Sequence, residues 1–142
     1  MGYSDQMFYT RPLLLWGQAV SFGTTTASSV TGANATDVAP QIPTFTRRSI
    51  VNAMVLRCTV IPDAGSTALV AHFMNGTDTA GTVTLTTATA DARLAFTMVA
   101  ASAVIASGSQ PTIKITGTST ASADAQGSYD IWAEVQELPQ SA

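Results

Sequence analysis

The chain has 142 residues, of which 11% are charged and 46% hydrophobic, and its formal net charge is −3 at pH 7. Soluble domains ordinarily carry about 25% charged residues, because charge hydrates the surface and keeps neighbouring copies apart. The acidic balance disfavours nucleic acid as a partner, and no apolar run approaches the ~20 residues that cross a bilayer. We therefore expect a soluble protein, made in a cytoplasm, whose partners are other proteins and neither nucleic acid nor membrane.

The first third of the chain predicts an extended arm and a loop. Residues 1–16 are rich in aromatic side chains without a steady alternation, and residues 13–22, bounded by Pro12 and Gly23, are a candidate first strand. Residues 23–43 form a polar stretch of Thr, Ser, Asn and Pro that cannot bury enough area to fold alone. We expect residues 1–45 to form an arm and loop that can include one strand, and residues 46–142 to form a β-sandwich, in a single domain overall.

Beyond residue 45, short alternating segments separated by turns predict strands. They cover residues 49–61, 67–74, 81–87, 93–99, 111–118 and 129–138, while residues 100–107 fit either a short helix or a further strand. Threonine suits the outward positions, because its β-branched side chain fits a pleated sheet and its hydroxyl is polar without charge. Asn75-Gly76 is a favoured tight turn. Together with the candidate strand at residues 13–22 these make seven or eight strands, which predict an all-β fold, an antiparallel sandwich or barrel.

Alternation also predicts which side chains face inward on two of these strands. On the strand 49–61 one face holds Met54, Leu56, Cys58 and Val60, and on the last strand Tyr129, Ile131, Ala133 and Val135 oppose Asp130, Trp132, Glu134 and Gln136.

Groups that could perform catalysis or bind metal are few. Cys58 stands alone in an apolar run, which predicts a buried thiol, and His72, the sole histidine, lies within a strand. Aspartates fall singly into separate turns, although loops at one end of a sandwich could still bring two together around calcium. Glu134 and Glu137, three residues apart on a strand, would point to opposite faces and so do not form a catalytic pair. We expect no catalytic residue, no cofactor and no metal.

Two groups of residues are candidates for partner binding. The arm supplies aromatic and arginine side chains, which are enriched at binding hot spots. The second group is a pair of adjacent cations at the entrance to a strand; either group could instead serve the chain's own fold. The candidate partner-binding residues are Tyr3, Phe8, Tyr9, Arg11, Trp16, Arg47 and Arg48.

The whole chain resembles, in style, the decoration or cement proteins of tailed-bacteriophage heads. The features that carry the resemblance are low charge, abundant Thr, Ser, Ala and Gly, the arm, a jelly-roll-like run of strands, and the final aromatic strand Gly127-Ser128-Tyr129-Asp130-Ile131-Trp132-Ala133-Glu134-Val135. The lambda-type members are smaller and have fewer strands, so a β-sandwich form is the better match. The resemblance contains no specific motif, so it transfers no individual functional residue.

The resemblance implies an antiparallel, jelly-roll-like β-sandwich with an extended N-terminal arm. It implies a structural protein of the virion, made in the host cytoplasm, that binds the major capsid protein on the capsid exterior as a homotrimer and performs no chemistry. Three alternatives stay open at this point: a carbohydrate- or receptor-binding module of a virion fibre, with Trp132 as a sugar platform; a small jelly-roll coat subunit; and a minor enzyme domain with a carboxylate or calcium site.

Overall fold

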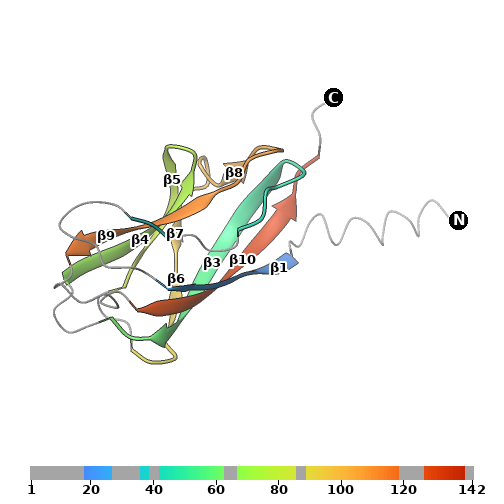
Figure 1. The fold of residues 1–142 in the computed structure, drawn as a ribbon. Coiled ribbons are helices and arrows are strands. Elements are labelled where there is room, and N and C mark those ends of the chain that lie inside the picture. The colour runs from blue at the N-terminus through green and yellow to red at the C-terminus, as the bar shows by residue number, and fades with distance from the viewer. Residues whose placement is uncertain are drawn as a thin grey trace, which may run out of the picture.

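The computed structural model describes residues 18–26, 36–38, 42–62, 67–85, 89–118 and 127–139, and these contain strands and no helix (Figure 1). The strands are β1 (Gln18–Thr26), β2 (Thr36–Val38), β3 (Ser49–Val60), β4 (Thr67–Asn75), β5 (Asp78–Thr84), β6 (Arg93–Ala95), β7 (Thr97–Met98), β8 (Val104–Ile105), β9 (Thr112–Thr118) and β10 (Ser128–Glu137). Every pairing between them is antiparallel. The prediction of an all-β, antiparallel fold is confirmed.

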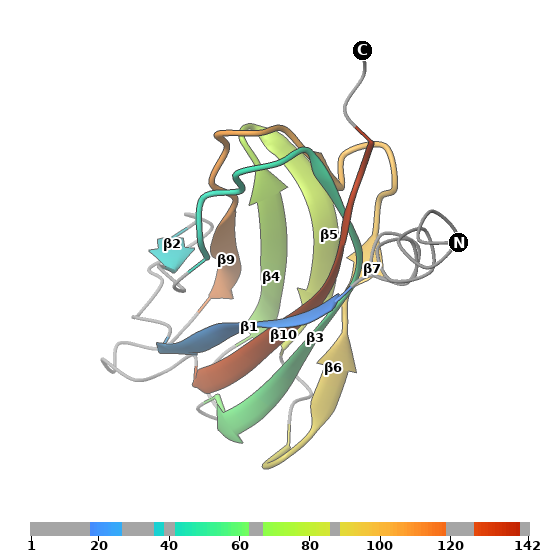
Figure 2. The same cartoon turned by 90° about the vertical axis from the view of Figure 1, so that its right-hand side faces the viewer.

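The strands form two five-stranded sheets that lie as separate layers (Figure 2). Sheet A has the order β1-β10-β3-β6, with β8 pairing beside β6 on the same strand β3, and sheet B has the order β2-β9-β4-β5-β7. The pairs are nested along the chain: β4 pairs with β5, β3 with β6 and β8, β2 with β9, and β1 with β10. The chain is therefore one long folded ribbon whose successive strand pairs alternate between the layers.

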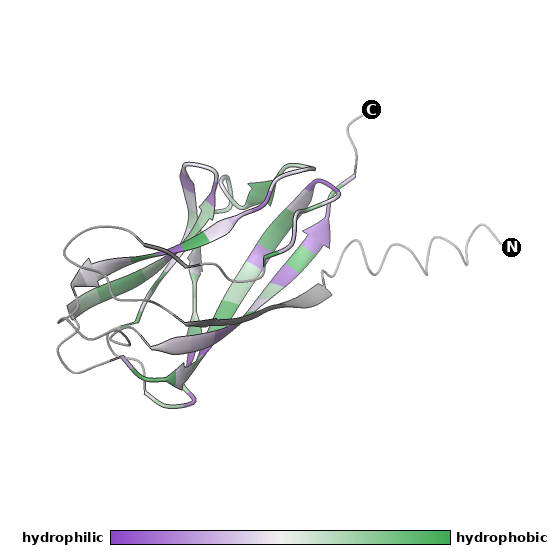
Figure 3. Cartoon of the chain, viewed as in Figure 1, coloured by the Kyte–Doolittle hydropathy of each residue, from purple (hydrophilic) through white to green (hydrophobic). Residues whose placement is uncertain are grey.

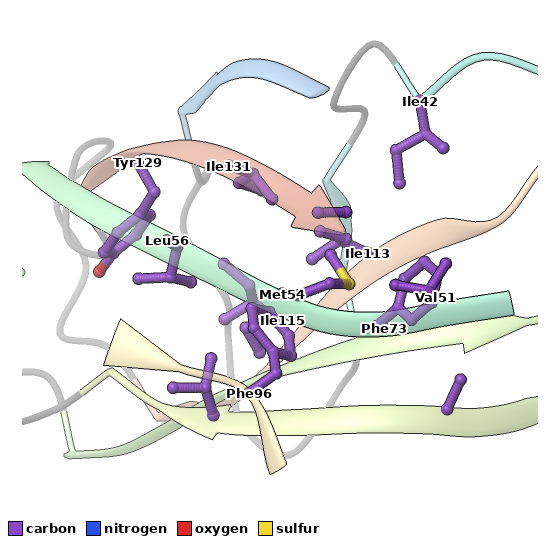
Figure 4. Packing of buried hydrophobic residues seen from close by; sticks show 14 of the residues in the cluster. Ile42, Val51, Met54, Leu56, Phe73, Phe96, Ile113, Ile115, Tyr129 and Ile131 are labelled. Atoms are coloured by element: carbon purple, nitrogen blue, oxygen red, sulfur yellow. The ribbon is translucent and has the colours of Figure 1, made fainter. Parts of the chain in front are cut away.

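The core lies between the two sheets and is made largely by alternate residues of β3, β4, β5, β9 and β10 (Figure 4). Figure 3 shows the same alternation as hydrophobic and hydrophilic residues along β3 and β10. Sheet A contributes Met54, Leu56, Tyr129 and Ile131, and sheet B contributes Leu69, Phe73, Val83, Ile113 and Ile115. Because each of these side chains is almost fully buried, the period-2 pattern is what holds the layers together, at about 1.5–3 kcal/mol per large apolar side chain.

A β-bulge in β3 turns outward one of the four residues that were predicted to face the core. Met54, Leu56 and Cys58 are buried as expected, but the Val60 side chain is 51% exposed. Cys58 pairs with Tyr129 and Val60 with Ser128, so Thr59 is an extra residue on β3 that has no partner on β10. One inserted residue reverses the alternation, and Val60 consequently leaves the core. On β10 the predicted alternation holds.

The segment expected to be one strand at residues 93–99 is divided between the sheets. β6 pairs with β3 in sheet A, while β7 pairs with β5 in sheet B. Phe96 lies at the crossing, is buried, and its backbone N–H donates to the carbonyl of Met54 at 2.9 Å. A buried aromatic residue can anchor such a corner where a strand changes sheets. In the following segment, 100–107, the strand alternative is correct, since it contains β8.

Two boundaries also differ from the predictions. β5 begins at Asp78, three residues before the predicted start, because the Asn75-Gly76 turn is tight, with Gly76 at φ 62°, and pairing resumes at once. The last residue of β5 is Thr84, and residues 86–87 of the predicted strand lie outside the described residues. In the N-terminal third, Gly23 does not end the first strand: β1 continues to Thr26, with a register shift between Ser21 and Gly23. The stretch predicted as a loop thus contains the end of β1 and the whole of β2.

Candidate interaction surfaces

The outer face of sheet B is poor in charge. We call it the threonine face, and it consists of Val70, His72, Thr82, Thr84, Thr97, Thr112, Lys114 and Thr116, which alternate with the buried side chains of β4, β5, β7 and β9. Among the residues of this sheet whose side chains the structure describes, Lys114 is the only charged one on this face. Threonine keeps the face polar without charge, and its stiff χ1 angle means that little side-chain entropy is lost when the face is covered.

His72 lies in the middle of the threonine face. Its strand neighbours in register are Lys114 on β9 and Thr82 on β5, and its Nε2 lies 2.9 Å from the Thr116 hydroxyl oxygen. Partial burial lowers the pKa of the imidazole below its ordinary value of 6.5. The ring is therefore neutral at pH 7 and becomes charged only in acid.

The outer face of sheet A has a different character. We call it the tryptophan face; its centre is Trp132 on β10, opposite Val55 on β3, which is opposite Ala95 on β6. The Trp132 side chain is 37% exposed although it occupies an inner strand of the sheet. Trp132, Val55 and Arg93 line a shallow depression of about 280 Å³. The indole therefore has an apolar neighbour on one side and a guanidinium within the same hollow.

Charged residues flank this depression. Asp130 is opposite Arg57 in the sheet, and Arg57 is opposite Arg93, so one row across β10, β3 and β6 carries three charges. Arg57 donates through both Nε and Nη2 to Oδ1 of Asp91, the former at 3.0 Å. This hydrogen bond and the attraction of the carboxylate raise the pKa of Arg57 above its ordinary value. The pair is exposed, so it orients the Arg57 side chain more than it stabilises the fold.

Of the predicted partner-binding residues, the structure describes two. Arg47 and Arg48 are exposed at the entrance to β3. The Arg47 Nη1 atom lies 3.2 Å from Oε2 of Glu137 at the end of β10, and the Arg48 carbonyl accepts a hydrogen bond from the Leu138 N–H at 2.9 Å. The first arginine thus ties β3 to β10, while the second keeps its guanidinium at the surface. Tyr3, Phe8, Tyr9, Arg11 and Trp16 lie outside the described residues.

The other reactive side chains of the described region belong to the core. Cys58 is a free, fully buried cysteine whose thiol donates to the Val60 carbonyl oxygen at 3.3 Å, and burial raises its pKa. Burial likewise raises the pKa of the Tyr129 phenol. Both groups are therefore in their protonated forms at neutral pH, as the prediction for Cys58 requires.

Within the residues that the structure describes, no three His, Cys, Asp or Glu side chains are grouped so as to hold a metal ion. No helix among those residues is both long enough and apolar enough to cross a membrane.

The sequence pattern identified Trp132 and its outward direction but not the depression beside it. The other two residues that line the depression, Val55 and Arg93, lie on β3 and β6, and the pairing of these strands joins residues far apart in the chain. The available signal was the alternation on β3, which places Val55 and Arg57 on the outward side.

Comparisons with known proteins give one distant structural likeness. A chain of the solved structure "Cyanophage Pam1 capsid asymmetric unit" superposes with a TM-score of 0.48 and 18% sequence identity, over 88% of this chain and 88% of that one. At these values the likeness carries no argument about fold or function. No family model matches the chain. No curated protein matches it either.

Proposed function

We propose that the protein is a structural component of a phage virion, a decoration protein that binds the outer surface of an icosahedral capsid as a homotrimer and stabilises the shell. The observation that carries the proposal is the threonine face, a sheet surface on which Lys114 is the only charged residue among the described residues of β4, β5, β7 and β9. Stable protein interfaces are depleted in charge at their centre, and this face is the charge-poor surface of the described region. We assign it to contacts between subunits.

The nested strand pairing supports the same class of protein. In the proposal the chain is a jelly roll, and the nested pairing of β1 with β10, β2 with β9, β3 with β6 and β4 with β5 in alternating sheets supports this assignment. Jelly rolls are frequent in viral capsid and lectin domains. The fold is compatible with many functions, so the choice among them depends on the surfaces and on the resemblance of the whole chain to decoration proteins.

The shell contact is assigned to the arm and to the arginines at the entrance to β3. Residues 1–16 supply the aromatic anchors, and the exposed Arg48 guanidinium supplies a cation beside the end of β10. A trimer presents three copies of every such contact, which multiplies retention without any new type of interaction. In this proposal the protein has no catalytic activity.

The experiment measures retention on purified tailed-phage heads by cosedimentation, together with the mass of the protein in solution. The test variant is the full-length chain with Phe8, Tyr9 and Arg11 replaced by alanine, and the control is Val99→Ala, which shortens an exposed side chain of the sandwich. The proposal expects the wild type and the control to bind heads as trimers and the test variant to bind more weakly. Full retention of the test variant, with no trimer in solution, would overturn it.

A second function is favoured by one specific feature, the depression beside Trp132. An exposed indole can serve as a stacking platform for a sugar ring, and Arg93 in the same depression is available as a hydrogen-bond donor. A glycan array on which the wild type binds and Trp132→Ala does not, combined with a monomeric mass, would replace the decoration proposal with a glycan-binding one.

A further inference from the structure

Among the described strands, one edge of sheet A is long and uncharged. β1 is the terminal strand of that sheet, and among the described strands it pairs with β10 alone. It is nine residues long, Gln18-Ala19-Val20-Ser21-Phe22-Gly23-Thr24-Thr25-Thr26, and contains neither a charged residue nor a proline. An edge strand presents unpaired backbone N–H and C=O groups, and natural proteins protect long ones with charges, prolines or coverage.

The remaining described edges carry that protection. β2 has three residues, including Asp37, and β6 has three, including Arg93. β7 and β8 have two residues each. β1 has only the register shift between Ser21 and Gly23, which leaves a run of four paired residues on each side. Among the described edge strands, β1 is therefore the long one without charge.

We propose that this edge pairs with β1 of a second copy of the chain, antiparallel and about a two-fold axis, so that the two A sheets become continuous. A two-fold contact brings the same surface of both subunits together. Such a contact is stable only where no like charges lie opposite each other across the axis, and an uncharged strand satisfies this condition. Main-chain hydrogen bonds along the strand then supply the affinity, as in other cases of strand addition.

This contact is separate from the threonine face, which lies on the other sheet. It rests on the proposed function for its biological role, because on a shell it would link neighbouring trimers into a continuous network. The contact itself is a property of the chain alone. It can therefore be tested in solution without any capsid.

Glu134 provides a matched pair of variants. Its register partners are Ala19 on β1 and Ala53 on β3, so Ala19→Lys and Ala53→Lys each place a lysine opposite the same exposed carboxylate. Only the first puts the charge on the edge strand. We expect Ala19→Lys to weaken the two-fold association by about tenfold, because a charged side chain on an edge strand disfavours strand addition, and Ala53→Lys to leave it unchanged.

Two measurements complete the test: native mass spectrometry over a dilution series, and hydrogen exchange of the β1 amides at the same concentrations. At high concentration the proposal expects even-numbered multiples of the subunit or of the trimer. The β1 amides that do not bond to β10 should be protected from exchange at high concentration and should exchange rapidly after dilution. Equal protection at all concentrations would show that the chain covers its own edge and would overturn the proposal. Rapid exchange in the associated protein, or unchanged association of Ala19→Lys, would also overturn it. If the wild-type protein associates through β1 but does not bind phage heads, only the proposed function is refuted.

Discussion

Gly127 precedes β10 at a point where the backbone leaves no room for a side chain. Its φ angle is +82°, and a Cβ atom there would overlap the carbonyl oxygen of Val60 and lie 3.1 Å from the Tyr129 hydroxyl. Alanine in the left-handed region costs roughly 1–2 kcal/mol, and moving the end of β3 away from an overpacked atom costs about 1–3 kcal/mol. We therefore expect Gly127→Ala to lower the free energy of unfolding by about 3 kcal/mol.

Gly108 is a matched control for this prediction. Its φ angle of +83° is nearly the same, but a Cβ atom there would meet nothing within 4 Å. Gly108→Ala should thus incur only the backbone cost, roughly 1–2 kcal/mol. Urea unfolding of both variants, followed by tryptophan fluorescence, gives the two losses, and their difference isolates the contact with Val60. Equal losses for the two variants would refute the packing argument at the junction of β3 and β10.

Two further predictions concern a strained residue and a titrating one. Ala68 has a φ of 53° at the register shift between β4 and β9, so Ala68→Gly should raise the free energy of unfolding by about 0.5–1 kcal/mol. The control Ala95→Gly, on an ordinary strand residue, should lower the free energy of unfolding. A change of the same sign in both variants would contradict the backbone strain at Ala68. Because burial lowers the pKa of His72, the unfolded chain binds the proton first, and the free energy of unfolding should fall as the pH drops below about 6.5. Urea unfolding at pH 7.5 and pH 5 should show a smaller pH dependence in His72→Gln than in the wild type; an identical dependence would exclude His72 as its source.

The inward and outward residues of the inner strands could be predicted from the sequence because burial on a sheet has a period of two. Tyr129, Ile131 and Ala133 are buried and Trp132 and Glu134 are exposed, as the alternation on the last strand indicates. The departures occur where the period is broken. Thr59 adds one residue to β3 and exposes Val60, and a bulge of this kind is visible only in the pairing of two distant segments.

The other departures also arise from contacts between distant parts of the chain. A run of threonines indicates a loop when its composition is considered alone, yet Thr24–Thr26 pairs with Ser128–Asp130 as the edge of sheet A. Likewise, Leu94, Phe96 and Met98 alternate as one strand would, but the chain passes from one sheet to the other at Phe96. The charge-poor surface could be anticipated from composition, whereas its location on sheet B depends on which strands the fold brings together.

The mass of the protein in solution shows whether the threonine face joins copies of this chain into a trimer. The test compares the wild type with Thr84→Lys, which places a charge on an exposed residue of that face, and with Ala53→Lys, which adds the same charge to the opposite sheet. We expect trimers or multiples of trimers for the wild type and Ala53→Lys, and smaller species for Thr84→Lys. A wild type that is monomeric at micromolar concentration, or a Thr84→Lys variant with unchanged mass, would contradict it.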